Sequence, residues 1–346
     1  MTKYIHIGFP KNFSTSLQRD YFSKHPEIYH LGIGLDSNLG YRDSMIEKTL
    51  EVYLKTCKEY KYLEEKNKII AHFQNIFNSE EKHQKAIGIS AEHLSFSFSY
   101  DSLSAPEKAR RLFEIFGNGT KVIMIVRNQF DLIKSLYRES VRVGFAGDFK
   151  SYFNLIFKYQ DRNYIYDFRY DLVYETYSQL FGDQNVAVFF FEEYRKEDGK
   201  MKEGEAGTKL LEDLNSFLKL SNPEMMLAHY NEAISSNKIL NKAALNKNEP
   251  HDLGNHLLES AEKHRIKKYL EEDLQYIEIE EKVYSDVLVK RKLTEKAIIS
   301  DWSQPINYKI EGHIYDKLKS FYEKGNQKLQ SIIQNTIPES YFNLKL

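Results

Sequence analysis

Cysteines and long apolar runs are scarce in this chain. Its one cysteine, Cys57, can make no internal disulfide, and no cysteine or histidine accompanies it at the spacing of a zinc site. We therefore expect a reducing compartment. No stretch approaches the roughly eighteen consecutive apolar residues of a membrane-spanning helix, and the strand-like residues 4–9 leave no room before them for a signal peptide. These absences predict a cytoplasmic protein without a membrane span.

An excess of charge of one sign is missing as well. The 49 lysines and arginines nearly balance the 50 aspartates and glutamates, which leaves a formal net charge of -1 at pH 7. Such a chain has no overall basic field to attract a polyanion, so nucleic acid is not the expected partner. What the chain does contain is 41% hydrophobic residues among 346, enough to bury a substantial core.

Short apolar runs rich in β-branched and aromatic residues recur along the chain. Four of them cover residues 4–9, 86–90, 121–126 and 185–191, and a weaker fifth covers 27–31. Each is followed by a segment with helical spacing. The run 121–126 is hydrophobic at consecutive positions, as in parallel strands that helices cover on both faces. The pattern predicts an α/β fold similar to that of the P-loop NTPases, with a parallel sheet of about five strands flanked by helices.

Two longer segments outside the predicted sheet are polar and helical in pattern. Residues 44–81 form most of an expected helical insertion at about 41–83, in which helical spacing predicts one buried face made of Leu50, Tyr53, Leu54, Cys57 and Tyr60. Residues from about 223 to 304 carry dense charge and few glycines or prolines, which predicts an irregular helical C-terminal part over about 223–346. The chain has no internal repeat and no low-complexity linker. We therefore predict a single domain over residues 1–346.

A strand, a loop and the start of a helix follow one another in residues 4–24. The loop carries a lysine and three hydroxyl groups, and its residues are Lys11, Asn12, Phe13, Ser14, Thr15 and Ser16. A junction of this kind directs backbone N–H groups and the positive end of a helix dipole toward one point. We therefore predict that these residues bind a phosphate or sulfate group. The alternative is a simple capped helix, with Ser14 or Thr15 as N-cap and Lys11 in solvent.

The loop departs from the nucleotide kinases at two positions. In the P-loop pattern G-x-x-x-x-G-K-[ST], Gly8 and Thr15 match, but Phe13 and Ser14 replace the second glycine and the lysine. A kinase is therefore only an alternative interpretation. The lysine instead stands at position 11, directly after a proline, and in this the loop resembles the donor-binding loop of the sulfotransferases, P-K-x-G-T-T. Phe13 replaces the common glycine of that loop.

The resemblance implies the donor 3′-phosphoadenosine 5′-phosphosulfate (PAPS) and a sulfuryl transfer that needs no metal ion. In such a reaction Lys11 is the cation that follows charge onto the bridging oxygen of the leaving phosphate. The hydroxyl groups of Ser14, Thr15 and Ser16 would hold the 5′-phosphate. Sulfuryl transfer, like phosphoryl transfer, is promoted mainly by positioning and electrostatics.

A second segment, far away in the sequence, carries a similar signal. Arg127 ends the predicted strand 121–126, and an arginine at this edge of a parallel strand lies in the crevice where α/β sheets bind ligands. The pattern R-N-x-x-D-x-x-x-S-x-Y that begins there resembles the 3′-phosphate segment of sulfotransferases. The resemblance implies that Arg127 and Ser135 bind the 3′-phosphate of the donor. The alternative is an arginine paired with a surface carboxylate.

Two further stretches are similar to sulfotransferases in a less specific way. The residues Phe191-Glu192-Glu193-Tyr194 resemble the Y-E-D that closes a strand near the adenine in that family. The tail 314–346 resembles the C-terminal end of bacterial members. The resemblance therefore extends over about the whole chain, although only the first two segments are specific.

The base that would take the acceptor proton is expected just after the predicted strand 86–90. The stretch Ala91-Glu92-His93-Leu94-Ser95 resembles the K-T-H-L-P of cytosolic sulfotransferases at its histidine and leucine, which implies His93 as the base. A near-neutral histidine pKa agrees with that role. Glu92 is the alternative, because other sulfotransferases use a glutamate. Adjacent residues at a strand end point to opposite sides, so we expect only one of the two to face the acceptor.

The expected partners are a small-molecule donor and an acceptor that carries a hydroxyl group. A saccharide or polysaccharide is the first candidate for the acceptor. A nucleotide or small-molecule kinase and a non-catalytic adenosine-bisphosphate-binding module are the alternative functions. No cluster of metal ligands is evident in the sequence.

Overall fold

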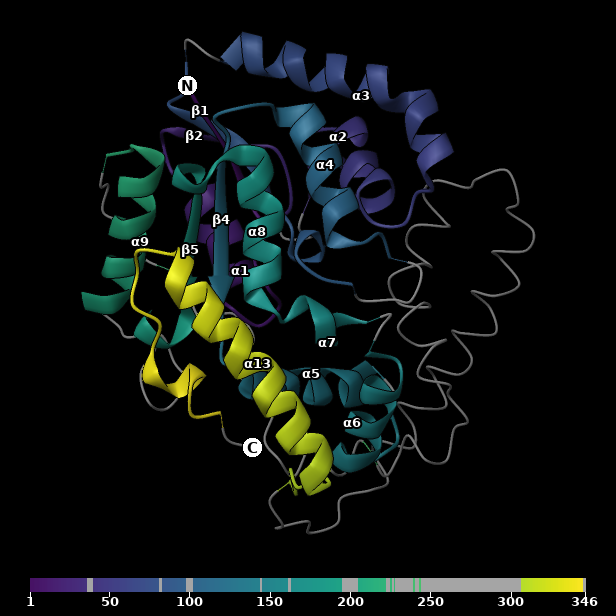
Figure 1. Ribbon diagram of the computed structural model, residues 1–346. Coiled ribbons are helices and arrows are strands. Elements are labelled where there is room, and N and C mark those ends of the chain that lie inside the picture. Colours follow the sequence, from purple (N-terminus) through teal and green to yellow (C-terminus); the bar gives the residue numbers. More distant parts are fainter. Residues whose placement is uncertain are drawn as a thin grey trace, which may run out of the picture. The chain divides into compact units, whose positions relative to one another are not determined.

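The computed structural model describes residues 1–35, 40–80, 83–97, 102–143, 145–160, 163–194, 205–221 and 306–344, together with 225, 227, 239 and 243 (Figure 1). Contacts divide the chain into two compact units. The first comprises Met1–Leu132, Asp161–Glu232 and Asp316–Lys345, and the second Ile133–Gln160, Ala233–Tyr315 and Leu346. The single domain expected from the sequence remains a prediction.

The first unit contains a five-stranded sheet with the strand order β2-β3-β1-β4-β5, in which every pairing is parallel. Its strands are β1 (Thr2–His6), β2 (Ile28–His30), β3 (Ala86–Ser90), β4 (Lys121–Val126) and β5 (Val186–Phe190). This confirms the α/β class and the parallel sheet. His6 lies opposite Ser90 of β3 and Ile123 of β4, so the segments that follow β3, β1 and β4 leave the sheet side by side.

Helices cover the sheet because its strands are apolar on both faces. Burial is complete along β3, and all of β4 except Lys121 is buried. The helix α8 (Tyr170–Phe181) packs on β4 and β5, and α4 (Ala105–Phe116) packs on α8 (Figure 1). A separate core cluster joins the strands to the π-helix Leu17–Phe22, which continues the short α1 (Ser14–Ser16), and to α9 (Glu205–Leu218).

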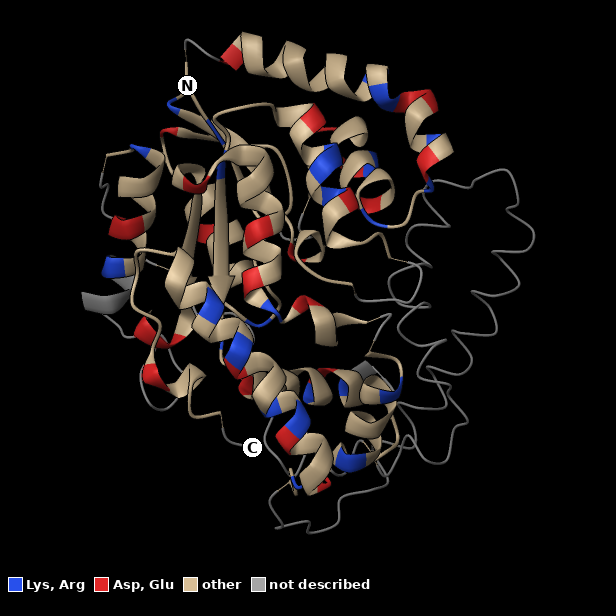
Figure 2. Cartoon of the chain, viewed as in Figure 1, with Lys and Arg blue, Asp and Glu red and all other residues tan. Residues whose placement is uncertain are grey.

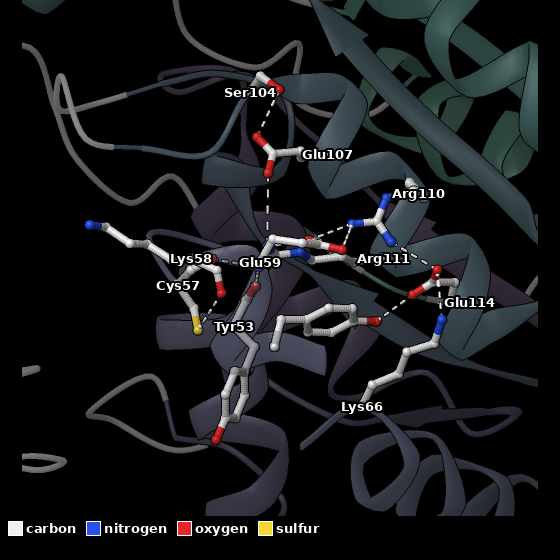
Figure 3. A network of polar contacts seen from close by, with 11 residues as sticks. Tyr53, Cys57, Lys58, Glu59, Lys66, Ser104, Glu107, Arg110, Arg111 and Glu114 are labelled. Atoms are coloured by element: carbon white, nitrogen blue, oxygen red, sulfur yellow. Dashed lines mark hydrogen bonds and ion pairs between the residues drawn. The ribbon is translucent and has the colours of Figure 1, made fainter. Parts of the chain in front are cut away.

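The helical insertion expected from the sequence is interrupted in the structure. It consists of α2 (Ser44–Lys48), the π-helix Thr49–Tyr53 and α3 (Glu59–Glu80). The break exists because Arg111 of α4, a fully buried side chain, donates to the carbonyls of Tyr53 and Cys57 at 2.6 and 2.8 Å and to the Glu59 carboxylate at 2.9 Å (Figure 3).

The break also changes the expected buried face of the insertion. Leu50, Tyr53, Leu54 and Cys57 are buried as predicted, but Tyr60 is 67% exposed because it follows the break. The spacing that places it with the other four assumes an uninterrupted helix.

The second unit contains two further described helices besides the first residues of a longer C-terminal one. They are the later part of α5 (Gln129–Val143), which starts in the first unit, and α6 (Phe149–Lys158). Aromatic rings of Tyr137, Phe145, Phe149 and Tyr152 pack together there, and Arg138 donates to the Tyr308 hydroxyl at 2.9 Å.

The described C-terminal part of the chain contains one long helix, and residues 306–311 and 333–338 are not helical. The first unit also holds α7 (Tyr164–Asp167) and most of α13 (Gly312–Ile332). Residues 244–305 of the predicted helical part lie outside the described residues. Charged residues of both signs lie on α3 and α13 (Figure 2), in keeping with the balanced composition. Within the described parts of the chain, no helix has the length and apolar character needed to cross a membrane.

Candidate functional site

The loop between β1 and α1 contains two residues in a left-handed backbone conformation. Lys11 has a φ of 63° and Phe13 a φ of 62°. This conformation costs a non-glycine residue about 1–2 kcal/mol, so the surrounding structure must enforce it. Phe13 thus adopts the conformation that a glycine would favour at the same place. Left-handed residues in such turns let backbone N–H groups form concavities that bind anions.

The helix that follows the loop has no side-chain cap from its N-cap residue. Its N-cap is Phe13, whose side chain has no hydrogen-bonding group, so the alternative interpretation with Ser14 or Thr15 as N-cap is wrong. By contrast, Asp43, Asp148 and Asn163 accept hydrogen bonds from backbone amides at the starts of α2, α6 and α7. The starts of α4 and α8 also lack a side-chain cap, so this feature leaves the α1 amides available to an anion but does not by itself mark an anion site.

Hydrogen bonds to backbone carbonyls hold two side chains of the loop between β1 and α1. Asn12 is fully buried, and its Nδ2 donates to the carbonyl of Ile125 in β4 at 3.0 Å. Ser14 is buried and donates to the Phe9 carbonyl at 3.3 Å. Ser16 is also buried, whereas Lys11 and Thr15 are half-buried. Because the Asn12 side chain fastens the loop to β4, any contact from Asn12 to an anion would come from its backbone.

Arg127 brings the second predicted segment to this loop. Its Nη1 donates to the carbonyl of Lys11 at 3.4 Å, and its guanidinium lies over the ring of Phe191, 4.9 Å from the centroid. The Phe191 ring in turn lies 4.3 Å from that of Phe13. The left-handed loop residue, the aromatic ring after β5 and the arginine after β4 therefore form one stack.

The residues after Arg127 have roles that the sequence interpretation missed. The Oδ1 of Asn128 accepts from the amides of Phe130 and Asp131 at 3.1 and 3.3 Å, so Asn128 caps α5. The Asn128 amide donates to Glu192 at 2.9 Å, and the Tyr341 hydroxyl donates to the same carboxylate at 2.7 Å. Glu192 belongs to the stretch after the last strand, and the Y-E-D resemblance is the one signal that pointed to it.

Ser135 belongs to the second unit, where it is half-buried on α5. Its expected part in binding the 3′-phosphate stays a prediction.

Glu92 and His93 lie in a short 3-10 turn (Glu92–Leu94), not on the strand. Strand alternation therefore does not apply to them, and the argument that only one can face the acceptor is wrong in that form. The turn adjoins the start of the loop between β1 and α1, because the Ala91 amide donates to the His6 carbonyl at 3.1 Å and the Ser95 hydroxyl to the Gly8 carbonyl at 3.2 Å. Both candidate bases are thus held beside the predicted donor site.

The environment of His93 differs from what a free histidine would have. Its side chain is buried, and burial lowers its pKa to about 3, although the nearby Glu51 carboxylate acts in the opposite direction. The near-neutral pKa expected for this residue is therefore not found. Glu92 is half-buried.

A buried lysine that the sequence interpretation missed holds the segment 93–97. Lys108 of α4 is fully buried and donates to the carbonyls of His93 and Phe96 at 2.7 and 2.9 Å. Asp167 accepts from the Ser97 amide at 2.7 Å, and Tyr177 donates to the Leu94 carbonyl at 2.9 Å.

Burial shifts the pKa values of Lys108 and Asp167. Burial lowers the pKa of Lys108 to about 8 against the opposing effect of Asp167, and burial raises the pKa of the Asp167 carboxyl. A lysine on the apolar face of a helix, beside Ala105 and Ala109, was the available sequence signal.

No group of three or more histidine, cysteine, aspartate or glutamate side chains that could hold a metal ion occurs in the described portion of the chain.

Comparisons with known proteins identify similar solved structures but no family. No family model matches the sequence, and no curated protein does. A sulfotransferase from Alicyclobacillus acidocaldarius is 16% identical over 76% of this chain and 96% of its own, with a TM-score of 0.45. Mouse sulfotransferase SULT7A1, crystallised with PAP, is 15% identical over 72% of this chain and 66% of its own, with a TM-score of 0.32. The function is therefore argued from the residues of the site.

Proposed function

We propose that this protein is a sulfotransferase that moves a sulfuryl group from PAPS to an acceptor hydroxyl. The observation that carries the proposal is the hydrogen bond of 3.4 Å from Arg127 to the carbonyl of Lys11. It joins two segments 116 residues apart, each of which carries a cation, at the carboxyl edge of neighbouring strands. A donor with a phosphate group at the 3′ and at the 5′ position of its ribose needs a cationic side chain near each phosphate. The carboxyl edge of the strands is where α/β sheets bind ligands.

The proposed reaction is one displacement at sulfur. The acceptor oxygen forms a bond to the sulfur while the bond from sulfur to the bridging phosphate oxygen breaks, and adenosine 3′,5′-bisphosphate leaves. The ammonium group of Lys11 would stabilise the charge that develops on the bridging oxygen. The first turn of α1 and the hydroxyls of residues 14–16 would hold the 5′-phosphate, while Arg127 and Ser135 would hold the 3′-phosphate.

The acceptor proton would pass to His93 or to Glu92. Both follow β3 in a turn that Lys108, Tyr177 and Ser95 fasten in place. A base acts efficiently when its position is fixed and its pKa lies near the working pH. The His93 imidazole has the fixed position but a lowered pKa, so an acceptor or donor charge would have to raise that pKa on binding.

The acceptor is proposed to be an alcohol, and saccharides are the first class to test. Transfer of radioactive sulfate from labelled PAPS to pools of saccharides, lipids and small alcohols tests the proposal directly. We expect a labelled product that Lys11→Ala fails to form at the wild-type rate. Phosphate transfer from ATP that needs Mg²⁺ would instead indicate a kinase, and nucleotide binding without any transfer would indicate a non-catalytic module.

A further inference from the structure

A buried histidine lies directly beneath the anion loop. His6 is the last residue of β1 and is fully buried. Its Nδ1 is 2.7 Å from the hydroxyl oxygen of Ser90, to which Gln18 also donates at 3.0 Å. The proposed reaction assigns no role to His6.

The hydrogen bonds of Ser90 indicate which nitrogen of His6 carries the proton. The Ser90 oxygen accepts from Gln18, and among the described residues Nδ1 of His6 is the one acceptor for its hydroxyl hydrogen. The ring hydrogen then resides on Nε2. Burial lowers the pKa of His6 to about 3, with a smaller effect from His30, so the imidazole is neutral near pH 7.

The Nε2 atom of His6 faces the loop and is a buried atom without a hydrogen-bond partner in the described structure. A Cβ atom placed on Gly8 would lie 2.5 Å from this Nε2 and 3.2 Å from the hydroxyl oxygen of Ser14. The imidazole edge and the Ser14 hydroxyl therefore face the same space beside the Cα of Gly8. This explains why residue 8 is a glycine, since any side chain there would collide with the imidazole.

A buried N–H without an acceptor costs about 1–3 kcal/mol, so its presence calls for an explanation. The neighbouring Ser14 hydroxyl supplies one. It donates to the Phe9 carbonyl over a long 3.3 Å, and its lone pairs can still accept a hydrogen bond.

We propose that His6 is a positioning residue of the anion loop, whose Nε2–H donates to the Ser14 oxygen when the donor binds and so turns the Ser14 O–H toward the 5′-phosphate. This inference rests on the proposed function. Ser14 would exchange its weak bond to Phe9 for one to the phosphate, while Ser90 and Gln18 keep the imidazole in the required tautomer. Gly8 leaves the space in which this exchange takes place.

Two substitutions separate the two nitrogens of the ring. The amide of His6→Gln reaches about as far as Nε2, whereas that of His6→Asn reaches about as far as Nδ1. We expect His6→Gln to bind adenosine 3′,5′-bisphosphate within about threefold of the wild-type affinity and His6→Asn to bind about tenfold more weakly, as the loss of one hydrogen bond implies. Titration calorimetry gives the affinities, and thermal unfolding shows that the variants fold.

The control is His25→Asn. His25 is also buried and its Nδ1 accepts from the Glu27 amide at 3.1 Å, but it lies beyond the far end of the π-helix Leu17–Phe22. We expect the affinity of this variant to stay within about twofold of wild type, because the loop is untouched.

The outcomes distinguish this inference from the proposed function. If the wild type binds adenosine 3′,5′-bisphosphate and His6→Asn binds it equally well, the role of His6 is wrong and the proposed function is unaffected. If the wild type does not bind it, the proposed function fails and the role of His6 fails with it. Should both His6 variants fail to fold, Ser90→Ala replaces them. Without the Ser90 hydroxyl the His6 ring hydrogen can reside on either nitrogen, so we expect about threefold to tenfold weaker binding of adenosine 3′,5′-bisphosphate. Unchanged binding would refute the role of His6.

Discussion

The ammonium group of Lys108 lies 2.7 Å from the carbonyl oxygen of His93 and 2.9 Å from that of Phe96, with no exposure to solvent. One buried charge thus holds the middle of the turn that carries the two candidate bases and the chain just after that turn. Two hydrogen bonds from a charged donor, and the two carbonyls that would be left without it, make this lysine important for stability.

Lys108→Met should lower the free energy of unfolding by about 2–5 kcal/mol, because it removes both bonds and leaves Asp167 without its nearby cation. Urea unfolding measures the change. The matched control is Lys85→Met, since Lys85 forms a surface ion pair with Glu27 and its side chain is 58% exposed. We expect Lys85→Met to lower the free energy of unfolding by less than about 1 kcal/mol. Equal losses in the two variants would show that Lys108 does not hold the turn.

Mild acid should destabilise the protein. Burial lowers the pKa values of His6 and His93 to about 3 and that of His30 to about 4, whereas an unfolded histidine titrates near 6.5. The unfolded state therefore binds more protons below pH 6.5, and stability falls as pH falls. The slope for each such histidine rises toward about 1.4 kcal/mol per pH unit as the pH falls well below 6.5.

Urea unfolding at pH 7.5, 6.5 and 5.5 measures this effect while staying above the range in which carboxylates titrate. We expect the free energy of unfolding to fall by about 0.3 kcal/mol per buried histidine between pH 7.5 and 6.5, and by about 1 kcal/mol per buried histidine between pH 6.5 and 5.5. His93→Gln should reduce that decrease by about one histidine's share. A free energy that does not change between pH 6.5 and 5.5 would contradict the buried, neutral state of these rings.

The identity of the base can be decided by two substitutions. If His93 removes the acceptor proton, His93→Ala should lower kcat by roughly a hundredfold to ten-thousandfold while donor affinity stays near wild type, and Glu92→Gln should be mild. If Glu92 is the base, the two results exchange. Mild effects of both substitutions in a folded enzyme would remove both residues from the mechanism.

Lys11→Ala should reduce the chemical step more than donor binding. The lysine charge is most useful when negative charge develops on the leaving phosphate, so the substitution should lower kcat by more than it raises the donor KM. Single-turnover transfer of labelled sulfate measures the step itself. A raised donor KM with unchanged kcat would assign Lys11 to ground-state binding only. Added EDTA should leave the activity of the wild type intact, because the proposed reaction uses no metal.

Local patterns were sufficient to predict the sheet. The consecutive apolar residues of β4 and the strand, loop and helix order around Lys11 depend on neighbours in the sequence, and both were found where predicted. The proximity of Arg127 to Lys11 followed from the parallel order of the strands.

Features that depend on distant side chains could not be predicted in this way. The helix break after Tyr53 results from Arg111, and the fixed turn at His93 results from Lys108, each contributed by α4. Phe13 likewise adopts a left-handed conformation that its own preference disfavours, and its ring contacts that of Phe191, far away in the sequence. Burial of His93 lowers a pKa that the sequence alone suggests is near neutral.

The most direct test of the donor site is calorimetric titration with adenosine 3′,5′-bisphosphate and with AMP. We expect tighter binding of the bisphosphate, and we expect Arg127→Ala to remove about 1.5–3 kcal/mol of that binding, as for one charged hydrogen-bonded pair. The control is Arg142→Ala on α5, whose side chain is 56% exposed and pairs with Glu139, and its affinity should not change. Equal affinity for AMP and the bisphosphate, or an Arg127→Ala variant that binds both as the wild type does, would contradict a donor held between the Lys11 loop and Arg127.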